Sequence, residues 1–329
     1  MRRRDLLMLG LLAASIMASM PATALAQDRY PSRPVRLAIP AVAGGVHDVI
    51  GRLWAERIKP HFGTVVIDNR GGGGGLIAAN DIAHAQPDGY SLLMGSTTTN
   101  VLITPLLANP PYDPVKDFAA ITVFAYSSTS IVTNPSVPAR TLKELIDYAK
   151  ANPRKLSYGS AGNGSITNLA GELFKQRAGG LDIVHVPYKG IGQVVVDLVS
   201  GQIPMMSANA TAHILDLHRA GKVRILSVNS LARLKTAPDI PTSIEAGLPG
   251  MVAQTTFGIF APAGTPRPIL DRINQVTQDV MADEQFQREL LRLGFEPLLG
   301  VGPDKAAGVF QDELVRWTPI LKSVSTKPE

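Results

Sequence analysis

Residues 35–50 read VRLAIPAVAGGVHDVI and combine a short apolar run with the start of an amphipathic helix. The run Val35–Pro40 has the length of a buried strand, whereas apolar residues recur at helical spacing along Val46–Phe62. The same alternation continues in three further elements: the strand Thr64–Asp68, the helix Leu76–Gln86 and the strand Ser91–Gly95. Strands that alternate with helices across short loops predict a parallel sheet with right-handed crossovers.

A second set of strands and helices begins near residue 128. Its first helix runs to Ala151 and opens with the capping box Thr141-Leu142-Lys143-Glu144. The elements that follow are expected at Leu156–Gly159, Ser165–Ala178, Ile183–Val186, Gln193–Ser200, Ile203–Ser207, Ala212–Arg219, Val223–Val228 and Thr255–Phe260. A long helix is predicted from Arg267, and the tail from Asp283 to Leu321 is predicted to be mostly helical with a break at Phe295–Pro303.

Two clusters of βα units predict two α/β lobes. We expect the first lobe to comprise residues 27–127 and 254–329, and the second to comprise residues 128–253. The helices of the tail are then expected to pack back on the first lobe. Because the chain crosses between the lobes twice, the connection is expected to act as a hinge.

The first 26 residues have the features of a secretory signal peptide. Three arginines, Arg2–Arg4, precede an apolar stretch from Leu6 to Met20 and the small-residue site Ala24-Leu25-Ala26. The apolar stretch is shorter than the roughly 20 residues that a membrane-spanning helix needs. We therefore expect cleavage near Ala26 and a periplasmic mature chain. The basic start fits either Sec or twin-arginine export.

The composition excludes several classes of protein. The 329 residues include no Cys, so disulfides, thiolate metal sites and Cys nucleophiles are ruled out. Beyond residue 26 the remaining 303 residues carry 29 basic and 26 acidic side chains. The excess of basic over acidic side chains is small, and the basic residues are scattered along the chain, so nucleic acid is not favoured as a partner. No later segment has 18 consecutive apolar residues, so the mature chain is not expected to span a membrane.

Four loops rich in Gly, Ser and Thr follow predicted strands, and most of them precede a helix. They are residues 43–48 (AGGVHD), 95–100 (GSTTTN), 159–165 (GSAGNGS) and 187–190 (PYKG). Ligands of open α/β sheets bind beyond the carboxyl ends of strands. Backbone N–H groups at helix N-termini favour an anion there. A single loop of this kind is ordinary turn and cap chemistry, but four in equivalent positions predict a shared cleft for a small carboxylate.

Nucleotide and enzyme motifs are incomplete in these loops. The lysine of a phosphate-binding P-loop is missing after Gly164. Neither of the two glycine-rich segments, Gly71–Gly75 and Gly159–Gly164, completes the dinucleotide-binding motif G-x-G-x-x-G. Ser160 lacks the flanking Gly of a nucleophile elbow, because Tyr158 stands two residues before it. The six His residues show no metal-ligand spacing. We therefore expect no cofactor, no metal, no nucleophile–base arrangement and no enzymatic activity. Asp48 is interpreted either as a ligand contact or general base, or as a capping residue.

Nine short stretches run in order across nearly the whole mature chain. They are residues 30–36 (YPSRPVR), 44–48 (GGVHD), 68–70 (DNR), 85–90 (AQPDGY), 158–165 (YGSAGNGS), 186–190 (VPYKG), 238–242 (PDIPT), 245–250 (EAGLPG) and 260–266 (FAPAGTP). Together they resemble the tripartite tricarboxylate transporter receptors, also called the Bug family of extracytoplasmic solute receptors. The resemblance implies a type II periplasmic-binding-protein fold, in which two α/β lobes close on one small carboxylate.

Carried over residue by residue, the resemblance implies thirteen ligand-binding positions. They are Gly44, Gly45, Asp48, Ser96, Thr97, Thr98, Ser160, Asn163, Gly164, Ser165, Asn168, Tyr188 and Asn209. The sequence departs from the common family pattern at Asn168, where a His is frequent, and at Thr256, which stands near a frequent Trp. The positions expected to contact the carboxylate group of the ligand therefore match the family pattern, whereas positions in the distal part of the pocket depart from it. The sequence does not identify the ligand.

The resemblance also implies a partner and leaves alternatives. A monomeric receptor would deliver its ligand to a two-component membrane permease that an ion gradient drives. The same ligand site would equally suit a periplasmic sensor subunit that signals to a sensor kinase. A third alternative is an exported α/β hydrolase. The sequence contains no motif that would identify a protein partner on the lobe surfaces, so it does not distinguish a transport receptor from a sensor subunit.

Overall fold

The computed structural model describes residues 30–325. The chain divides into two compact units, Met1–Ser32 and Arg33–Glu329, and everything below concerns the second unit. The predicted signal peptide, residues 1–26, lies outside the described residues. Among the described residues, no helix combines the length and apolar character that crossing a bilayer requires.

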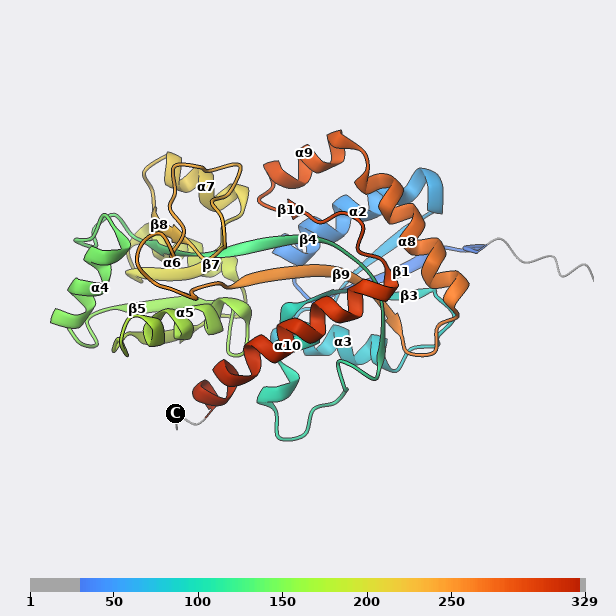
Figure 1. Ribbon diagram of the computed structural model, residues 1–329, viewed down its shortest axis with the longest axis horizontal. Helices are drawn as coiled ribbons and strands as arrows, with labels where there is room; N and C mark the ends of the chain where they lie inside the picture. Colours follow the sequence, from blue (N-terminus) through green and yellow to red (C-terminus); the bar gives the residue numbers. More distant parts are fainter. Residues whose placement is uncertain (1–29, 326–329) are drawn as a thin grey trace, which may run out of the picture. The chain divides into compact units, whose positions relative to one another are not determined.

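A ten-stranded mixed sheet runs through the second unit (Figure 1). Its strands are β1 (Val35–Ile39), β2 (Val65–Asn69), β3 (Ser91–Ser96), β4 (Phe118–Thr133), β5 (Ser157–Ser160), β6 (Val184–Pro187), β7 (Met205–Asn209), β8 (Arg224–Val228), β9 (Gln254–Pro262) and β10 (Glu296–Pro297). The strand order is β2-β1-β3-β9-β4-β7-β5-β6, and β8 and β10 also pair with β4.

Nine helices cover this sheet within the described residues. They are α2 (Val46–Phe62), α3 (Leu76–Ala83), α4 (Leu142–Ala151), α5 (Ile166–Arg177), α6 (Ile191–Ser200), α7 (Ala212–Arg219), α8 (Arg267–Met281), α9 (Glu284–Arg292) and α10 (Pro303–Ser325). Three short turns of helix, η1 (Gly73–Gly75), η2 (Thr98–Leu102) and η3 (Thr104–Leu106), lie in the loops after β2 and β3.

The predicted parallel pairing holds within two groups of strands. β1 pairs in parallel with β2 and β3, and β5 pairs in parallel with β6 and β7. The sheet as a whole is mixed, because β4 and β9 run antiparallel to their neighbours. The apolar patterning predicted no strand at Phe118–Thr133, which is the longest strand of the sheet.

β4 connects the two groups of parallel strands (Figure 1). Its residues 118–128 pair with β9, and its residues 129–133 pair with β7. The middle of this strand, residues 126–130, reads YSSTS and has no apolar alternation. Two of its hydroxyl groups bond to the backbone of distant segments: Thr129 Oγ1 donates to the Ala253 carbonyl at 2.8 Å and Ser130 Oγ donates to the Ala208 carbonyl at 2.9 Å, whereas Ser127 Oγ is buried without a partner among the described residues.

The helices of the tail pack on two parts of the sheet. Helix α8 lies against α2, where Trp54 Nε1 donates to Thr277 Oγ1 at 3.1 Å in a buried contact. An ion pair between Arg57 and Glu289 joins α2 to α9. Helix α10 reaches further along the sheet, because its Trp317 belongs to the same apolar core as Phe174 of α5.

Candidate functional site

The loop after β1 holds the first three candidate residues, and its polar groups bond to one another. Gly44 adopts φ +79°, a backbone conformation that favours glycine, and its N–H donates to Asp48 Oδ2 at 2.8 Å. Gly45 is the N-cap of α2, and its N–H donates to the Val42 carbonyl at 3.1 Å. Both glycine N–H groups therefore already have partners within the loop.

Asp48 is buried and holds this loop to the neighbouring strand. Its Oδ1 accepts from Arg52 Nε at 2.8 Å and from Asn69 Nδ2 at 2.9 Å. Burial alone would raise the pKa of Asp48, but the hydrogen bonds from Arg52, Gly44 and Asn69 lower it below its usual value. Both carboxylate oxygens are thus engaged within the protein, by the loop, by α2 and by β2, and the two interpretations of Asp48 stay open.

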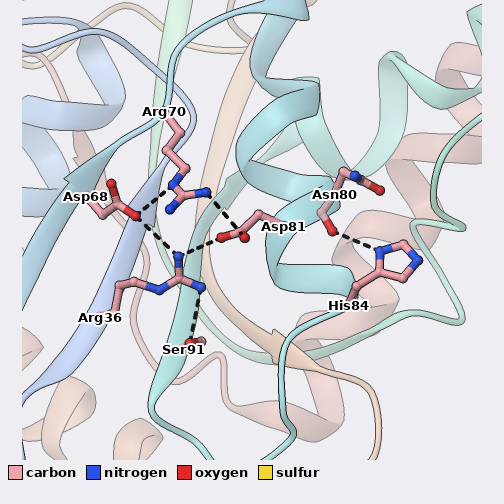
Figure 2. A network of polar contacts seen from close by, with 7 residues as sticks. All are labelled: Arg36, Asp68, Arg70, Asn80, Asp81, His84 and Ser91. Atoms are coloured by element: carbon pink, nitrogen blue, oxygen red, sulfur yellow. Dashed lines mark hydrogen bonds and ion pairs between the residues drawn. The ribbon is translucent and has the colours of Figure 1, made fainter.

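The Asp68-Asn69-Arg70 motif alternates across the end of β2, so its side chains serve two sides of the sheet. Asn69 faces Asp48, whereas Asp68 and Arg70 form an ion-pair network with Arg36 and Asp81 (Figure 2). The Arg36–Asp81 distance is 2.7 Å and the Arg70–Asp68 distance is 2.8 Å. This network fixes α3 against β1 and β2, immediately beyond the glycine run of residues 71–75.

The loop after β3 places Ser96, Thr97 and Thr98 in the interior. Ser96 Oγ lies 2.8 Å from His47 Nε2. Thr97 Oγ1 donates to Glu313 Oε2 at 2.5 Å and accepts from the Thr256 N–H at 2.9 Å. Thr98 begins a π-helical turn, a feature that recurs at functional sites.

Glu313 of α10 is a site residue that no sequence motif indicated. It accepts hydrogen bonds from Thr97 Oγ1 and, at 2.8 Å, from Thr256 Oγ1. Burial raises the pKa of Glu313, although the two threonine hydroxyls act in the opposite direction. Because 216 residues separate Thr97 from Glu313, no local pattern could reveal the contact.

The loop after β5 brings Ser160, Gly164, Ser165 and Asn168 together. Ser165 is the N-cap of α5, and its hydroxyl accepts from the Asn168 N–H at 3.2 Å. Asn168 Oδ1 accepts from the Gly164 N–H at 3.1 Å. Ser160 Oγ accepts from the Gly162 N–H at 3.1 Å and lies 2.7 Å from His185 Nε2. Among these candidates Asn163 is the exposed one.

Two further candidates lie at the edges of this group. Tyr188 Oη donates to Asp197 Oδ2 at 2.8 Å, so its side chain is tied to α6. Its N–H donates to the Ser160 carbonyl at 3.1 Å. Asn209 Nδ2 donates to the Ser127 carbonyl at 3.2 Å and to Thr255 Oγ1 at 3.0 Å.

The candidates from the two groups of strands approach one another along two routes. On the first route, Gly164 lies beside the segment after β3, since a Cβ atom at Gly164 would lie 3.0 Å from Leu106 Cδ1 and 4.0 Å from Ile103 Cγ1. On the second route, Asn209 bonds to Thr255, and the next residue on β9, Thr256, bonds to Thr97. The predicted loops are therefore neighbours in space, as a shared site requires.

The structure corrects one expectation, that no serine stands beside a potential base. Ser96 pairs with His47, and Ser160 pairs with His185. Desolvation lowers the pKa of each histidine to about 4. Both serines are fully buried, and no carboxylate among the described residues bonds to either imidazole ring. Each pair therefore lacks, among the described residues, the orienting acid of a catalytic triad.

A cavity of about 710 Å³ lies apart from the predicted loops, between α5, α10 and residues 231–252. Leu173, Arg177, Leu231 and Arg316 are among its lining residues, and none of the thirteen candidates lines it. Over the described range, His, Asp and Glu side chains nowhere gather in a group of three that could hold a metal ion.

Comparison with known proteins identifies the family. Residues 50–326 match the model of the tripartite tricarboxylate transporter family receptor. Three solved structures resemble the chain closely. Rpa4515 of R. palustris with adipate is 33% identical with a TM-score of 0.84, covering 89% of this chain and 98% of that one. The periplasmic binding protein BugD is 33% identical with a TM-score of 0.83, covering 91% and 100%. MatC of Rhodopseudomonas palustris with bound malate is 29% identical with a TM-score of 0.82, covering 89% and 100%.

These similarities confirm the predicted fold class, a periplasmic solute-binding protein of mixed α/β type. The lobe boundaries and the thirteen candidate positions stay predictions. The matched family and the similar structure BugD are solute-binding receptors. The chain belongs to the tripartite tricarboxylate transporter receptors, the Bug-type periplasmic solute receptors.

Proposed function

We propose that this protein captures a small organic carboxylate in the periplasm and delivers it to a tripartite tricarboxylate-type membrane transporter without chemically altering it. The observation that carries the proposal is the juxtaposition of hydroxyl- and amide-bearing loops at the carboxyl ends of β1, β3 and β5. Solved relatives that hold adipate and malate support a dicarboxylate as the ligand.

Hydrogen bonds from backbone N–H groups and hydroxyl groups, rather than ion pairs with Lys or Arg, would hold the ligand. None of the thirteen candidates is Lys or Arg, so no full positive charge is available among them. The helices α2 and α5 begin in two of these loops, at the N-caps Gly45 and Ser165, and the N-terminus of a helix favours an anion. Burial strengthens such dipolar hydrogen bonds relative to bulk water.

Export, oligomeric state and ligand contacts belong to the same proposal. Residues 1–26 would direct export and be removed near Ala26, leaving a monomeric mature chain. Eleven of the thirteen candidates would contact the ligand directly or through ordered water, whereas Asp48 and Tyr188 would act through the loops that they fix. No cofactor is required for capture and delivery.

Ligand capture is tested by thermal unfolding of the mature protein against a panel of mono-, di- and tricarboxylates of three to eight carbons. A ligand at 100 times its dissociation constant should stabilise the fold by roughly 2.7 kcal/mol. The Ser160→Ala variant should lose most of that gain, whereas Lys143→Ala, on the exposed face of α4, should keep it. A panel that leaves the unfolding temperature of the wild type unchanged contradicts the proposal.

Delivery is tested separately, in cells that lack the gene. The proposal predicts loss of uptake of the ligand that the panel identifies, with normal induction of any genes that respond to that ligand. Loss of induction with intact uptake would instead assign the protein a sensory role.

A further inference from the structure

The cavity of about 710 Å³ lies where α10 passes beside α5, and residues 231–252, between β8 and β9, complete its wall (Figure 1). Its volume falls in the range of about 300–1,000 Å³ that sites for small molecules occupy. None of the thirteen candidate residues lines it. A ligand in this cavity would therefore be additional to the one that the candidate loops are proposed to hold.

Most of the side chains that line this cavity are apolar. They come from all three segments of the wall and are Leu173 of α5, Leu231 and Val252 of the segment before β9, and Pro319 and Ile320 of α10. Leu231 is 78% exposed, so most of its apolar surface faces water. A ligand with an apolar body would remove this surface from water, which is favourable.

Two guanidinium groups line the same cavity, and Arg177, the last residue of α5, carries the first. This group lies against the opposite segment, because a Cβ atom at Gly250 would be 3.4 Å from both Cζ and Nη2 of Arg177. No hydrogen bond or ion pair joins the Arg177 guanidinium to another described residue. The N–H donors of its planar fork are therefore available to a ligand.

Arg316 of α10 carries the second guanidinium group. Its Nη2 lies 3.6 Å from Glu313 Oε1, which is longer than a hydrogen bond, and its Cζ lies 5.5 Å from the centre of the Trp317 ring. The Glu313 carboxylate already accepts from the hydroxyls of Thr97 and Thr256. No Asp or Glu is among the described residues that line the cavity, so the two positive charges have no acidic partner within it.

We propose that this cavity binds a monocarboxylate with an apolar chain. The planar fork of Arg177 matches the two oxygens of a carboxylate, and Arg316 adds a second positive charge. The apolar chain lies along Leu173 and Leu231, whose burial favours a long chain over a short one. The site is separate from the candidate loops and differs from them in using guanidinium groups, so this inference goes beyond the proposed function.

Titration calorimetry of the mature protein with octanoate tests the proposal, in the presence of a saturating amount of any short dicarboxylate that binds. We expect one equivalent of octanoate to bind. From butanoate to octanoate, each added methylene should tighten binding by up to about fourfold. The uncharged 1-octanol should bind at least about tenfold more weakly than octanoate. No binding of octanoate, or equal affinities for octanoate and 1-octanol, overturns the proposal.

Matched variants locate the bound octanoate. Arg177→Gln should weaken its binding about tenfold, whereas Arg292→Gln, which removes an equally exposed charge outside the cavity, should bind as the wild type does. Leu231→Asp puts a negative charge on the wall and should weaken binding at least as much as Arg177→Gln. All three side chains are exposed, so the variants should fold, which thermal unfolding checks. Equal affinities in Arg177→Gln and Arg292→Gln overturn the proposal.

A crossed comparison separates this cavity from the candidate loops. Ser160→Ala should keep octanoate binding and lose the short dicarboxylate, whereas Arg177→Gln should do the reverse. Octanoate binding that is lost in Ser160→Ala and kept in Arg177→Gln would place octanoate in the loops, which overturns this inference and leaves the proposed function standing. A wild type that binds octanoate through Arg177 and no short carboxylate would refute the proposed function and support this inference.

Discussion

At the scale of single residues, buried polar groups fix the loops that follow the strands. Asp48 and Glu313 each join a candidate loop to an element distant from it in the sequence, and Asn168 joins the loop after β5 to the helix α5 that follows it. A buried polar group stabilises a fold only when it is bonded, and removing one partner leaves the other with the full cost of desolvation. Substitutions at these residues should therefore affect both stability and ligand binding.

His47 should make stability depend on pH. Its pKa is about 4 in the folded protein and 6.5 when unperturbed, because burial disfavours the charged ring. Between these values the unfolded chain binds the extra proton, so stability present above pH 6.5 is lost as the pH falls toward 4. Between pH 7 and pH 5 this single group should cost about 2 kcal/mol.

The measurement compares denaturant unfolding of the wild type and His47→Gln at both pH values. The variant should lose less stability than the wild type over that interval. Equal losses would show that His47 does not carry the pH dependence.

Glu313 should give a pH dependence of folding stability opposite to that of His47. Because its folded pKa is raised, the stability that its neutral form contributes is present at acid pH and is lost as the pH rises. Glu313→Gln has nearly the same shape and cannot ionise, so its stability relative to the wild type should improve from pH 5 to pH 8. Glu313→Ala should cost about 2 kcal/mol or more, because the Thr97 and Thr256 hydroxyls lose their acceptor. A constant difference between Gln variant and wild type across that range would refute the assignment.

At the scale of elements, some helix N-caps only stabilise the start of their helix, whereas others also lie in a candidate ligand-binding loop. Thr141 caps α4 through the Glu144 N–H at 3.2 Å, as the capping box predicts, and lies far along the chain from every candidate loop. Ser165 caps α5 within the loop after β5. Thr141→Ala and Ser165→Ala should each cost about 1 kcal/mol of stability.

Ligand binding should distinguish these two variants. Thr141→Ala should bind the panel ligand as the wild type does, whereas Ser165→Ala should bind it several-fold more weakly. The two titrations, made alongside urea unfolding, check this. Equal affinities in both variants would remove Ser165 from the site.

The elements also show which features a single sequence reveals. Helix α2 was predicted to the residue, because apolar positions repeat every three to four residues from Val46 to Phe62. Helix α3 ends at Ala83, three residues before the predicted end at Gln86. Strand β4 was missed because its centre, residues 126–130, consists of Ser, Thr and Tyr, and the hydroxyls of Ser130 and Thr129 find partners 78 and 124 residues away. Local periodicity does not reflect such distant partners.

At the scale of the whole molecule, the fold class was predictable and the assembly of the site was predictable only in part. Short motifs in family order sufficed for the fold. The convergence of the loops after β3 and β5 depends on β4 and β9 and on Glu313 of α10, none of which a motif reveals. The ligand contacts expected of Asp48 and Tyr188 stay predictions, and no motif indicated that their side chains bond to Arg52, Asn69 and Asp197.

The central claim is that these loops hold a small organic carboxylate, and native mass spectrometry of freshly purified mature protein tests it most directly. We expect a fraction of the wild type to carry one small molecule whose accurate mass and fragmentation identify a carboxylic acid. Dialysis should remove it, re-addition should restore it, and the Ser160→Ala variant should retain much less. A retained molecule without a carboxyl group, or a wild type that neither retains nor rebinds any carboxylate, would contradict the account.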